Sequence, residues 1–526
     1  MNTNALRQKI LDLAIHGKLV KQDPSDESAT ILLEKIRAEK EKKIASGELK
    51  RGKNDSYIFF GDDNRHYEKF ADGRVKDIED EIPFAVPEGW AWCRLGEICE
   101  FISRGKTPVY TKESQYPVLA QKCNQWDGIR LDKVLFLDPN SLSKWTNEYH
   151  LQHEDIVINS TGTGTIGRVG IFDIGILGQY PFIVPDSHIS VVRCYKVYIH
   201  RKYIYHIFTS EYLQTKINKV ATGSTNQKEL PKKVLTEFFI PIPPLSEQQR
   251  IVAKIEAIFA QIDLLEQNKA DLQTAVKQAK SKILDLAIRG KLVPQDPADE
   301  PASVMLEKLH AEKEAKIAAG EIKRGKNDSY IYKNSTDNCY YQKYTDGCEE
   351  NISDEIPFTV PEGWMWCRLG EICSITMGQS PESSFISNNS DGMEFHQGKI
   401  HFTEKYIQKA NNYTFNITKI APKNAILLCV RAPVGVVNIT EREICIGRGL
   451  CSVYPKYRIQ SEFWFYWLQC QKDTFEQKST GTTFQAISIE LIKNILIPLP
   501  PSSEQKRIVA KIEELFAQLD SITAVL

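Results

Sequence analysis

The chain carries an internal duplication, and this constrains its fold more than any other feature. The segment KILDLAIHGKLVKQDP, from Lys9, returns almost unchanged from Lys282 as KILDLAIRGKLVPQDP. A second block, EIPFAVPEGWAWCRLGEIC from Glu81, returns from Glu355. A third, IPIPPLSEQQRIVAKI from Ile240, returns from Ile497 as IPLPPSSEQKRIVAKI. Because such repeats mark copies of one structural unit, the 526 residues predict two halves with a common framework.

Between the second and third blocks the two halves diverge. Residues 100–239 barely resemble residues 374–496. An enzyme with two equal active sites would keep these segments alike, whereas a protein with two different reading surfaces would not. The pattern therefore predicts a constant scaffold that carries two unlike domains.

The third block opens a long predicted helix. Its apolar residues recur at spacings of four and three, the heptad pattern of a coiled coil, and only Lys269 interrupts them. These residues are Ile251, Ile255, Ile258, Ile262, Leu265, Leu272, Val276, Ala279, Ile283 and Leu286. A helix of this length spans ~54 Å at 1.5 Å per residue. Ser246 and Gln249 resemble a capping box, and Gly17 and Gly290 stand where a C-terminal glycine cap belongs.

We expect the partner of this helix to come from the same chain. The C-terminal copy runs from Ile508 to Leu526, and Leu6, Ile10 and Leu13 continue its pattern at the other end of the sequence. The repeat therefore predicts that the second copy is split between the two ends, that Met1 and Leu526 lie close together, and that it pairs antiparallel with the unbroken copy about an approximate two-fold axis. A dimerisation stalk is the alternative reading of the heptads alone.

The two divergent segments predict strand-rich domains. Short β-branched runs such as DIVINS, HISVVRCY and AILLCVRA alternate with turns, and YIYHIFTSEYLQTKI and SEFWFYWLQCQKDTF each predict one helix. The fold class is thus α/β (α+β), with two strand-rich domains separated by an antiparallel pair of long coiled-coil helices. The expected parts are 1–80 (helical, with a charged helix and a basic loop), 81–245 (first domain), 246–354 (helical spacer), 355–501 (second domain) and 502–526 (C-terminal helix).

Composition narrows the class of protein. No stretch approaches the ~20 apolar residues that span a membrane, and the N-terminal segment lacks the features of a secretory signal, so we expect a cytoplasmic protein. The twelve cysteines form no Cys-x-x-Cys pair and are expected to be buried thiols rather than metal ligands. The net charge of −1 leaves nucleic-acid binding open, since charge can segregate along the chain.

Polar and basic residues collect on Gly-rich turns in both divergent domains. SRGKTPVY, QKCNQWDG, STGTGTIGR and ATGSTNQKEL occur in the first, and MGQSPESS, HQGK, VRAPVG, IGRGL and KSTGTTFQ in the second. Such side chains can contact phosphates and read base edges, although polar loops are common in all proteins. Gly162, Gly164 and Gly167 match G-x-G-x-x-G, but a strand is expected to follow where a dinucleotide site needs a helix. Walker, nucleophile-elbow and adenine-methyltransferase motifs are absent from the sequence, so we expect a non-catalytic chain.

At these residues the whole chain resembles the specificity subunit of Type I restriction–modification systems. IPIPPLSEQQRIVAKI and IPLPPSSEQKRIVAKI resemble the family's entry into its spacer helices, and the turn segments NSTGTGTIGRVG, GSTNQKEL, MGQSPESS and VRAPVGVVNI resemble those of its target-recognition domains. The resemblance implies a subunit without catalytic activity or cofactor of its own. It would bind a bipartite asymmetric site in double-stranded DNA and dock two methyltransferase subunits, which use S-adenosylmethionine, and restriction–translocase subunits.

The resemblance and the residue chemistry together select candidate DNA-binding residues. In the first domain they are Arg104, Lys106, Asn124, Thr163, Thr165, Arg168, His188 and Gln227, and in the second Gln379, Ser380, Gln397, Lys399, Arg431, Arg448, Thr482 and Gln485. Two alternatives remain at this point. One is a specificity subunit of a fused restriction–modification enzyme that cuts on both sides of its site, and the other is a coiled-coil scaffold that does not bind DNA.

Overall fold

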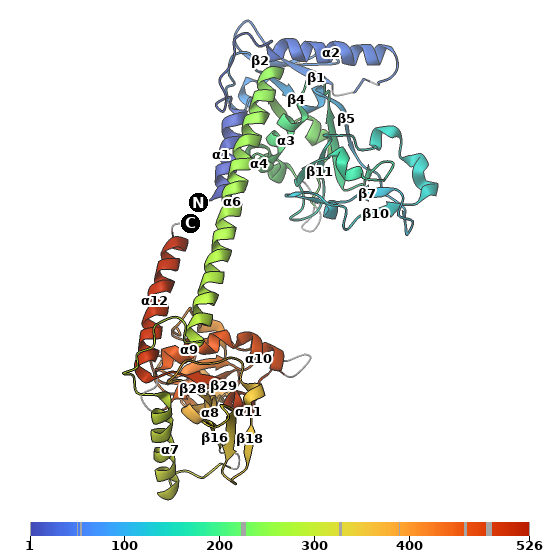
Figure 1. Cartoon of the computed structure of the whole chain (residues 1–526). Helices are drawn as coiled ribbons and strands as arrows, with labels where there is room; N and C mark the ends of the chain where they lie inside the picture. Colours follow the sequence, from blue (N-terminus) through green and yellow to red (C-terminus); the bar gives the residue numbers. More distant parts are fainter. Residues whose placement is uncertain are drawn as a thin grey trace. The chain divides into compact units, whose positions relative to one another are not determined.

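The chain folds into two compact units, residues 1–268 and 269–526. The computed structural model describes residues 2–49, 51–52, 55–221, 228–325, 329–388, 390–456, 460–479 and 486–524 (Figure 1). Each unit combines one strand-rich domain with helical segments, so the α+β class is confirmed. The five-part division with boundaries near 80, 245, 354 and 501 stays a prediction.

The first unit is built from the N-terminal half of the repeat. Its helices are α1 (Thr3–Ile15), α2 (Ala29–Ala45), α3 (Arg201–Thr209), α4 (Glu211–Val220), α5 (Lys232–Thr236) and the first part of α6 (Leu245–Ile288). Its strands are β1 (Ser56–Phe60), β2 (His66–Phe70), β3 (Val75–Asp77), β4 (Ala91–Arg94), β5 (Cys99–Arg104), β6 (Tyr110–Thr111), β7 (Pro117–Leu119), β8 (Asn124–Gln125), β9 (Gly128–Ile129), β10 (Leu135–Leu137), β11 (Ile156–Asn159), β12 (Val169–Ile171), β13 (Val184–Pro185), β14 (Ile189–Cys194) and β15 (Phe239–Ile242).

The second unit repeats this plan with different loops. Besides the end of α6 it contains α7 (Ala302–Ala318), α8 (Leu369–Ile372), α9 (Ser461–Cys470), α10 (Lys472–Lys478), α11 (Ile489–Asn494) and α12 (Ser502–Ala524). Its strands are β16 (Ser329–Lys333), β17 (Tyr340–Tyr344), β18 (Glu349–Asn351), β19 (Met365–Arg368), β20 (Cys373–Met377), β21 (Ile386–Ser387), β22 (Met393–His396), β23 (Tyr413–Thr414), β24 (Ile420–Ala421), β25 (Ile426–Cys429), β26 (Val437–Ile439), β27 (Ile444–Ile446), β28 (Leu450–Pro455) and β29 (Leu496–Leu499).

A four-stranded antiparallel sheet is common to both units, although their sequences diverge there. Its order is β12-β11-β14-β5 in the first unit and β26-β25-β28-β20 in the second. The register is also the same: Ile156 pairs with Ile171 and Val192 in one sheet, as Ile426 pairs with Ile439 and Val453 in the other. Every residue of the central strands β11 and β25 is buried. Both faces of the sheet are therefore covered, which is why these strands consist of nearly continuous apolar residues.

Within the first unit, α1 packs antiparallel on the first part of α6. The Arg7 guanidinium contacts Asp263 at 2.6 Å and lies 5.0 Å from the centre of the Phe259 ring. Farther along, Gln22 donates to the Glu247 carboxylate. Gln22 lies beyond the end of α1, and Glu247 precedes Asp263, so the partners on α6 run backwards in sequence as the chain advances, as an antiparallel pairing requires.

The second unit repeats these contacts with the equivalent residues. Lys280 contacts Asp520 at 2.5 Å and lies 5.0 Å from the centre of the Phe516 ring. Gln295 donates to the Glu504 carboxylate, just as Gln22 does to Glu247. The two helical pairings, α1 with the start of α6 and α12 with its end, are thus copies of one arrangement. Each has its partner within the chain, so the heptads do not require a dimerisation stalk.

A buried carboxylate ties each helical pair to its strand-rich domain. Glu247 accepts from the Trp90 indole N–H at 3.0 Å, and Glu504 accepts from Trp364 at 2.8 Å. Burial raises the pKa of both carboxyls, and the hydrogen bonds that they accept oppose that rise. This carboxylate clamp, Glu247 with Trp90 and Glu504 with Trp364, joins two blocks of the repeat that are far apart in sequence.

The glycine caps are confirmed and have a second role. Gly17 has φ +65°, its N–H bonds to Ala14, and the next N–H bonds to Leu13, which is the Schellman pattern. A Cβ at Gly17 would lie 2.3 Å from Pro87 Cγ, and one at Gly290 would lie 2.4 Å from Pro361 Cγ. Glycine is therefore required at both positions by the turn and by the packing.

Three details differ from the sequence predictions. YIYHIFTSEYLQTKI forms two helices rather than one, because Ser210 is extended between α3 and α4, and SEFWFYWLQCQKDTF is likewise divided at Gln471. The capping box at Ser246 is wrong, since α6 already begins at Leu245 after the two prolines. Leu265 and Leu272, which the heptads place at an interface, are exposed.

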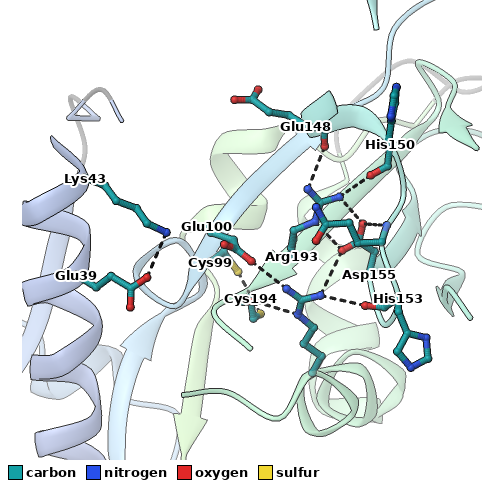
Figure 2. A network of polar contacts seen from close by, with 12 residues as sticks. Glu39, Lys43, Cys99, Glu100, Glu148, His150, His153, Asp155, Arg193 and Cys194 are labelled. Atoms are coloured by element: carbon teal, nitrogen blue, oxygen red, sulfur yellow. Dashed lines mark hydrogen bonds and ion pairs between the residues drawn. The ribbon is translucent and has the colours of Figure 1, made fainter. Parts of the chain in front are cut away.

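Two arginines enclose a buried carboxylate in the first domain (Figure 2). Arg193 forms a two-pronged pair with Asp155, at 2.8 and 2.6 Å, and also donates to the backbone oxygens of Glu148 and His150. Arg201 donates to the oxygens of Cys194 and His153 and lies 3.8 Å from Asp155. Charges this deeply buried are stable only when each is paired and hydrogen-bonded, and here the network meets that requirement.

Another buried titratable group of this unit is Glu97, whose side chain is 3% exposed and lies 3.1 Å from Arg37 of α2. Burial raises the pKa of Glu97 to about 8, and Arg37 only partly opposes the rise. Folding therefore favours the protonated carboxyl. The protonated Glu97 carboxyl contributes its full stability below pH 4.5, the pKa of this group in the unfolded chain, and this contribution is lost as the pH rises towards 8.

We therefore expect the first unit to lose stability between pH 5 and 8, by up to about 1.4 kcal/mol per pH unit from this group. Glu97→Gln should flatten that dependence in thermal melts recorded across the range. Glu113→Gln, at an exposed position in the same unit, is the control and should leave the slope unchanged. An unaltered slope in Glu97→Gln would contradict the assignment.

The cysteines are all free thiols. Nine are buried, Cys339 and Cys470 are partly buried, and Cys348 is exposed. Within the described residues, no helix has the length and apolarity needed to cross a membrane.

Candidate functional site

The predicted site residues of the first domain gather at one edge of its four-stranded sheet. β5 and β11 end at this edge, and β12 and β14 begin there. Arg104 is the last residue of β5, Thr163, Thr165 and Arg168 belong to the turn between β11 and β12, and His188 comes just before β14. We call this edge the first polar edge.

Close backbone approach shapes this edge. The Gly105 N–H bonds to the Ile189 oxygen, and a Cβ at Gly105 would lie 2.2 Å from the backbone oxygens of Pro185 and Asp186. The second unit has the same feature, because the Gly378 N–H bonds to Leu450 and a Cβ there would lie 2.2 Å from the Gly447 oxygen. Glycine is therefore required directly after β5 and after β20, because any side chain there would collide with the backbone of the neighbouring turn.

A relay of side chains holds the turn after β11. Gln121 donates to the Thr161 backbone oxygen at 2.9 Å, and the Thr161 hydroxyl lies 2.7 Å from His188 Nδ1. Thr165 donates to the Thr161 oxygen at 3.1 Å. Thr163, at the top of the turn, is exposed. The turn is thus fixed from beneath while its outer surface stays accessible to a ligand.

Arg104 is engaged within the protein. It donates to the Ser187 backbone oxygen at 3.0 and 2.6 Å and pairs with Glu229, which also bridges to Thr161. A carboxylate at this place would repel a phosphate approaching the same guanidinium. Arg104 therefore braces the first polar edge, and contact with an anion would require it to exchange Glu229.

Arg168 and Asn124 occupy different depths. Arg168 is half-buried and donates to Gln125 at 2.6 Å. Asn124, in contrast, is fully buried, and its amide donates to Asn159 at 2.9 Å and to the Arg168 backbone oxygen at 3.2 Å. The prediction that Asn124 contacts a ligand directly does not fit this position, because its side chain has no exposed atoms. It instead fixes the β8–β9 hairpin beneath Arg168.

Lys106 lies beside the edge, with its ammonium 4.4 Å from the centre of the Tyr149 ring and hydrogen-bonded to the Lys144 backbone oxygen.

Asp186 lies in the turn between β13 and β14. Burial raises the pKa of its carboxyl, although the N–H groups of His188 and Ile189 favour its charged form. Gln227 lies outside the described residues.

The second domain forms an equivalent second polar edge from different residues. Gln379 and Ser380 follow β20, Arg431 follows β25, and Arg448 follows β27. The Gln379 N–H bonds to the Ile446 oxygen, and the Arg448 N–H bonds to the Ser380 hydroxyl at 3.2 Å. Arg431 bridges to Ala486, as Thr161 bridges to Glu229 in the first unit. The structure thus brings these four residues together.

Gln397 and Lys399 adjoin this edge. A Cβ at Gly449 would lie 2.2 Å from the Gln397 backbone oxygen, so the loop after β22 lies against Arg448 and its neighbours. The side chains of Gln379, Gln397, Lys399, Arg431 and Arg448 are exposed. Thr482 and Gln485 lie outside the described residues.

A partly buried ion pair supports the second polar edge from below. Arg442 makes two 2.6 Å hydrogen bonds to Glu394, which also accepts from the Ala410 N–H at 2.6 Å. Burial opposes ionisation, but these partners and His396 outweigh it and lower the pKa of Glu394 to about 2. Glu394 is therefore charged at neutral pH and holds β22 beneath Gln397.

Sequence reasoning missed the supporting residues. Gln121, Glu229, Glu394 and Arg442 fix the two edges, yet each acts on a partner far away in the chain, which the residue pattern does not reveal. Gln121 does stand at the head of the QKCNQWDG turn, so its segment was identified but not its contact with Thr161. Among the described residues, no group of His, Cys, Asp and Glu side chains could hold a metal ion.

The comparisons with known proteins agree on one family. A family model described as "Type I restriction modification DNA specificity domain" matches residues 87–274 and 361–525. The chain is 27% identical to the Type I restriction enzyme EcoAI specificity subunit of Escherichia coli over 579 residues, which cover 97% of this chain and 88% of that protein. It is 26% identical to the EcoEI specificity subunit of the same species, covering 98% and 89%. A solved structure from work on complex assembly and conformational transition of the type I R-M system matches with a TM-score of 0.58 at 23% identity, covering 84% of this chain and 94% of that one, and it supports the fold.

Proposed function

Because the chain belongs to the family of Type I restriction–modification DNA specificity proteins, we propose that it selects the DNA sequence for such a complex, with each unit reading one half of a bipartite, asymmetric site. One observation carries this proposal. Two sheets of equal order and register present unlike polar residues at the same edge. Two equivalent sheets with different polar residues suit DNA, because its backbone geometry is the same at both half-sites while the base sequences differ.

The chemistry of the two edges suits double-stranded DNA. Arg and Lys side chains and Ser and Thr hydroxyls make the contacts that proteins use on phosphates. Gln379, Gln397 and Arg448 can form paired hydrogen bonds with adenine or guanine in the major groove. Rigid turns favour this task because a base contact is selective only when the side chain is held in position.

The repeated helices would then set the distance between the half-sites and bind the partner subunits. We propose that two methyltransferase subunits, with S-adenosylmethionine as their cofactor, and restriction–translocase subunits assemble on this chain. Methylation and cleavage would take place in those partners, and this chain would supply recognition alone.

The deciding experiment is to sequence methylated adenines in cells that express the chain with its methyltransferase. A bipartite motif with two unlike halves and a fixed spacer is the expected result. A motif that stays the same when residues 100–239 are replaced by those of a relative would refute recognition by the first domain. A scaffold without DNA contact predicts that outcome.

Arg168 offers a test of the first polar edge. Arg168→Ala should weaken binding of the assembled complex to its DNA about tenfold and lower the slope of log K against log salt by about 1, because one cationic contact is lost. Filter binding or fluorescence anisotropy at several salt concentrations measures both quantities. Arg74→Ala, at an exposed arginine in the turn between β2 and β3, is the matched control. An Arg168→Ala complex with unchanged affinity throughout the titration would count against the contact.

A further inference from the structure

We infer that Trp126 is a specificity-determining residue for the first half-site, where its indole makes an apolar contact with the base pairs. This inference rests on the proposed function and adds to it a residue of a different chemical kind. The other candidate residues are all polar or charged. Apart from the methyl groups of the threonines, they offer no apolar surface for a base contact such as one to the methyl group of thymine.

Exposure first draws attention to Trp126. Its side chain is 54% exposed, although tryptophan is among the side chains that gain most from burial. A single exposed apolar residue is common on proteins and means little alone. The position of Trp126 provides the second observation.

Trp126 lies at the tip of a short hairpin within the first polar edge. β8 and β9 pair through Asn124 with Ile129 and Gln125 with Gly128, which leaves Trp126 and Asp127 as a two-residue turn. The residue before Trp126 is Gln125, which accepts from Arg168 at 2.6 Å. The indole is therefore one residue away from the side chain that holds the candidate phosphate contact.

The hairpin is fixed to the sheet, so its tip is held in place. The buried Asn124 amide donates to Asn159 and to the Arg168 backbone oxygen, and the Arg130 N–H bonds to the Cys123 oxygen. A Cβ at Gly170 would lie 2.3 Å from Asn124 Oδ1, so β12 packs closely on the hairpin. A large aromatic ring on a rigid support loses little conformational freedom on binding, which is why such residues dominate many interfaces.

The surroundings of Trp126 match the surface of DNA. Lys122 and Arg130 are exposed on the same segment, with Arg130 paired to Asp127, and Arg168 adjoins it. Lys122 can bind a phosphate directly, and Arg130 can do so by exchanging Asp127, while the ring enters the groove. Apolar side chains read thymine through its methyl group in the major groove, and the indole N–H can also donate to a base acceptor.

The test compares complexes of methyltransferase with the wild-type chain, Trp126→Ala and Trp126→Phe. Methylated-adenine sequencing of cells expressing Trp126→Ala should show relaxed preference at one or two positions of the first half-site. The second half-site and the spacer should stay unchanged. In vitro, the affinity for the wild-type sequence should fall roughly tenfold without a change in salt slope, because no charge is removed. Trp126→Phe should recover most of the loss.

Phe60→Ala is the matched control, because Phe60 is an equally exposed aromatic residue (58%) at the end of β1, in the same unit. It should change neither the motif nor the affinity. Thermal melts of all variants show whether the first unit stays folded.

The outcomes separate this inference from the function on which it rests. If the wild-type chain directs no bipartite methylation, the proposed function fails. If the wild-type motif is found and Trp126→Ala reproduces it with affinity within twofold, the inference about Trp126 alone is overturned. A loss that is equal for specific and unrelated DNA would also overturn it, since that result marks a contact that does not read sequence.

Discussion

Replacing Asp155 by Ala should unfold the first unit far more readily than any surface substitution, at a cost of about 3–5 kcal/mol. Asp155 is fully buried and neutralises Arg193, whose side chain is 5% exposed, and it also lies 3.8 Å from Arg201 (Figure 2). Removing the carboxylate leaves the Arg193 guanidinium in the interior without a counter-charge, while Arg201 keeps its ion pair with Glu100 at 2.9 Å. Backbone oxygens of Glu148, His150 and His153 remain as acceptors but do not carry a full negative charge.

Calorimetry of the whole chain measures this effect, since the two units have separate cores. The transition of the first unit should shift to a much lower temperature, while that of the second unit stays in place. Asp72→Ala is the control, because the Asp72–Arg74 pair is exposed and such pairs contribute less than about 1 kcal/mol. A shift in Asp155→Ala no larger than in the control would show that the buried pair adds nothing.

The second large effect is expected from lengthening α6. Inserting four residues after Asn268 adds about one helical turn, ~6 Å, to the helix that both units share. If this helix sets the spacing of the half-sites, the complex should abandon its original site, with methylation there reduced at least about a hundredfold. It should methylate instead sites with the same two halves and a longer spacer, because neither polar edge has changed.

Methylated-adenine sequencing reports the halves and the spacer in one measurement. Asn268→Ala, which alters the same position without lengthening the helix, should leave the motif unchanged. New bases in either half-site would show that the helix does more than set a distance. Continued methylation of the original site would show that α6 does not set the spacing.

The sequence predicted what depends on local pattern. The heptads predicted the long helix α6, and the β-branched runs predicted β11, β14 and β25. Gly17 predicted a helix end, where packing against Pro87 also requires glycine. The break at Ser210 escaped prediction because the apolar pattern continues across it. The expected proximity of Met1 and Leu526 falls outside the described residues and stays a prediction.

The site was predicted in part. Turn segments rich in Gly, Ser, Thr and Arg identified both polar edges, since their residue types are visible in the sequence. Depth was not visible: an amide such as Asn124 can read a base or fill a core, and only the packing of Asn159 and Gly170 around it decides. The partners of Arg104 were also hidden, because Glu229 lies 125 positions away.

The paired contacts of the two helical segments bear on how such a protein changes over generations. Arg7 with Asp263 and Lys280 with Asp520 are two copies of one attachment, and so are the carboxylate clamps of Glu247 and Glu504. These attachments lie in the repeated blocks and not in the divergent segments, although Lys202 with Glu256 and Lys405 with Glu513 add a contact between each divergent segment and a helix. A foreign segment exchanged by recombination between the blocks would inherit the repeated attachments intact and would need to supply only such additional contacts itself. A new target could then arise in one step.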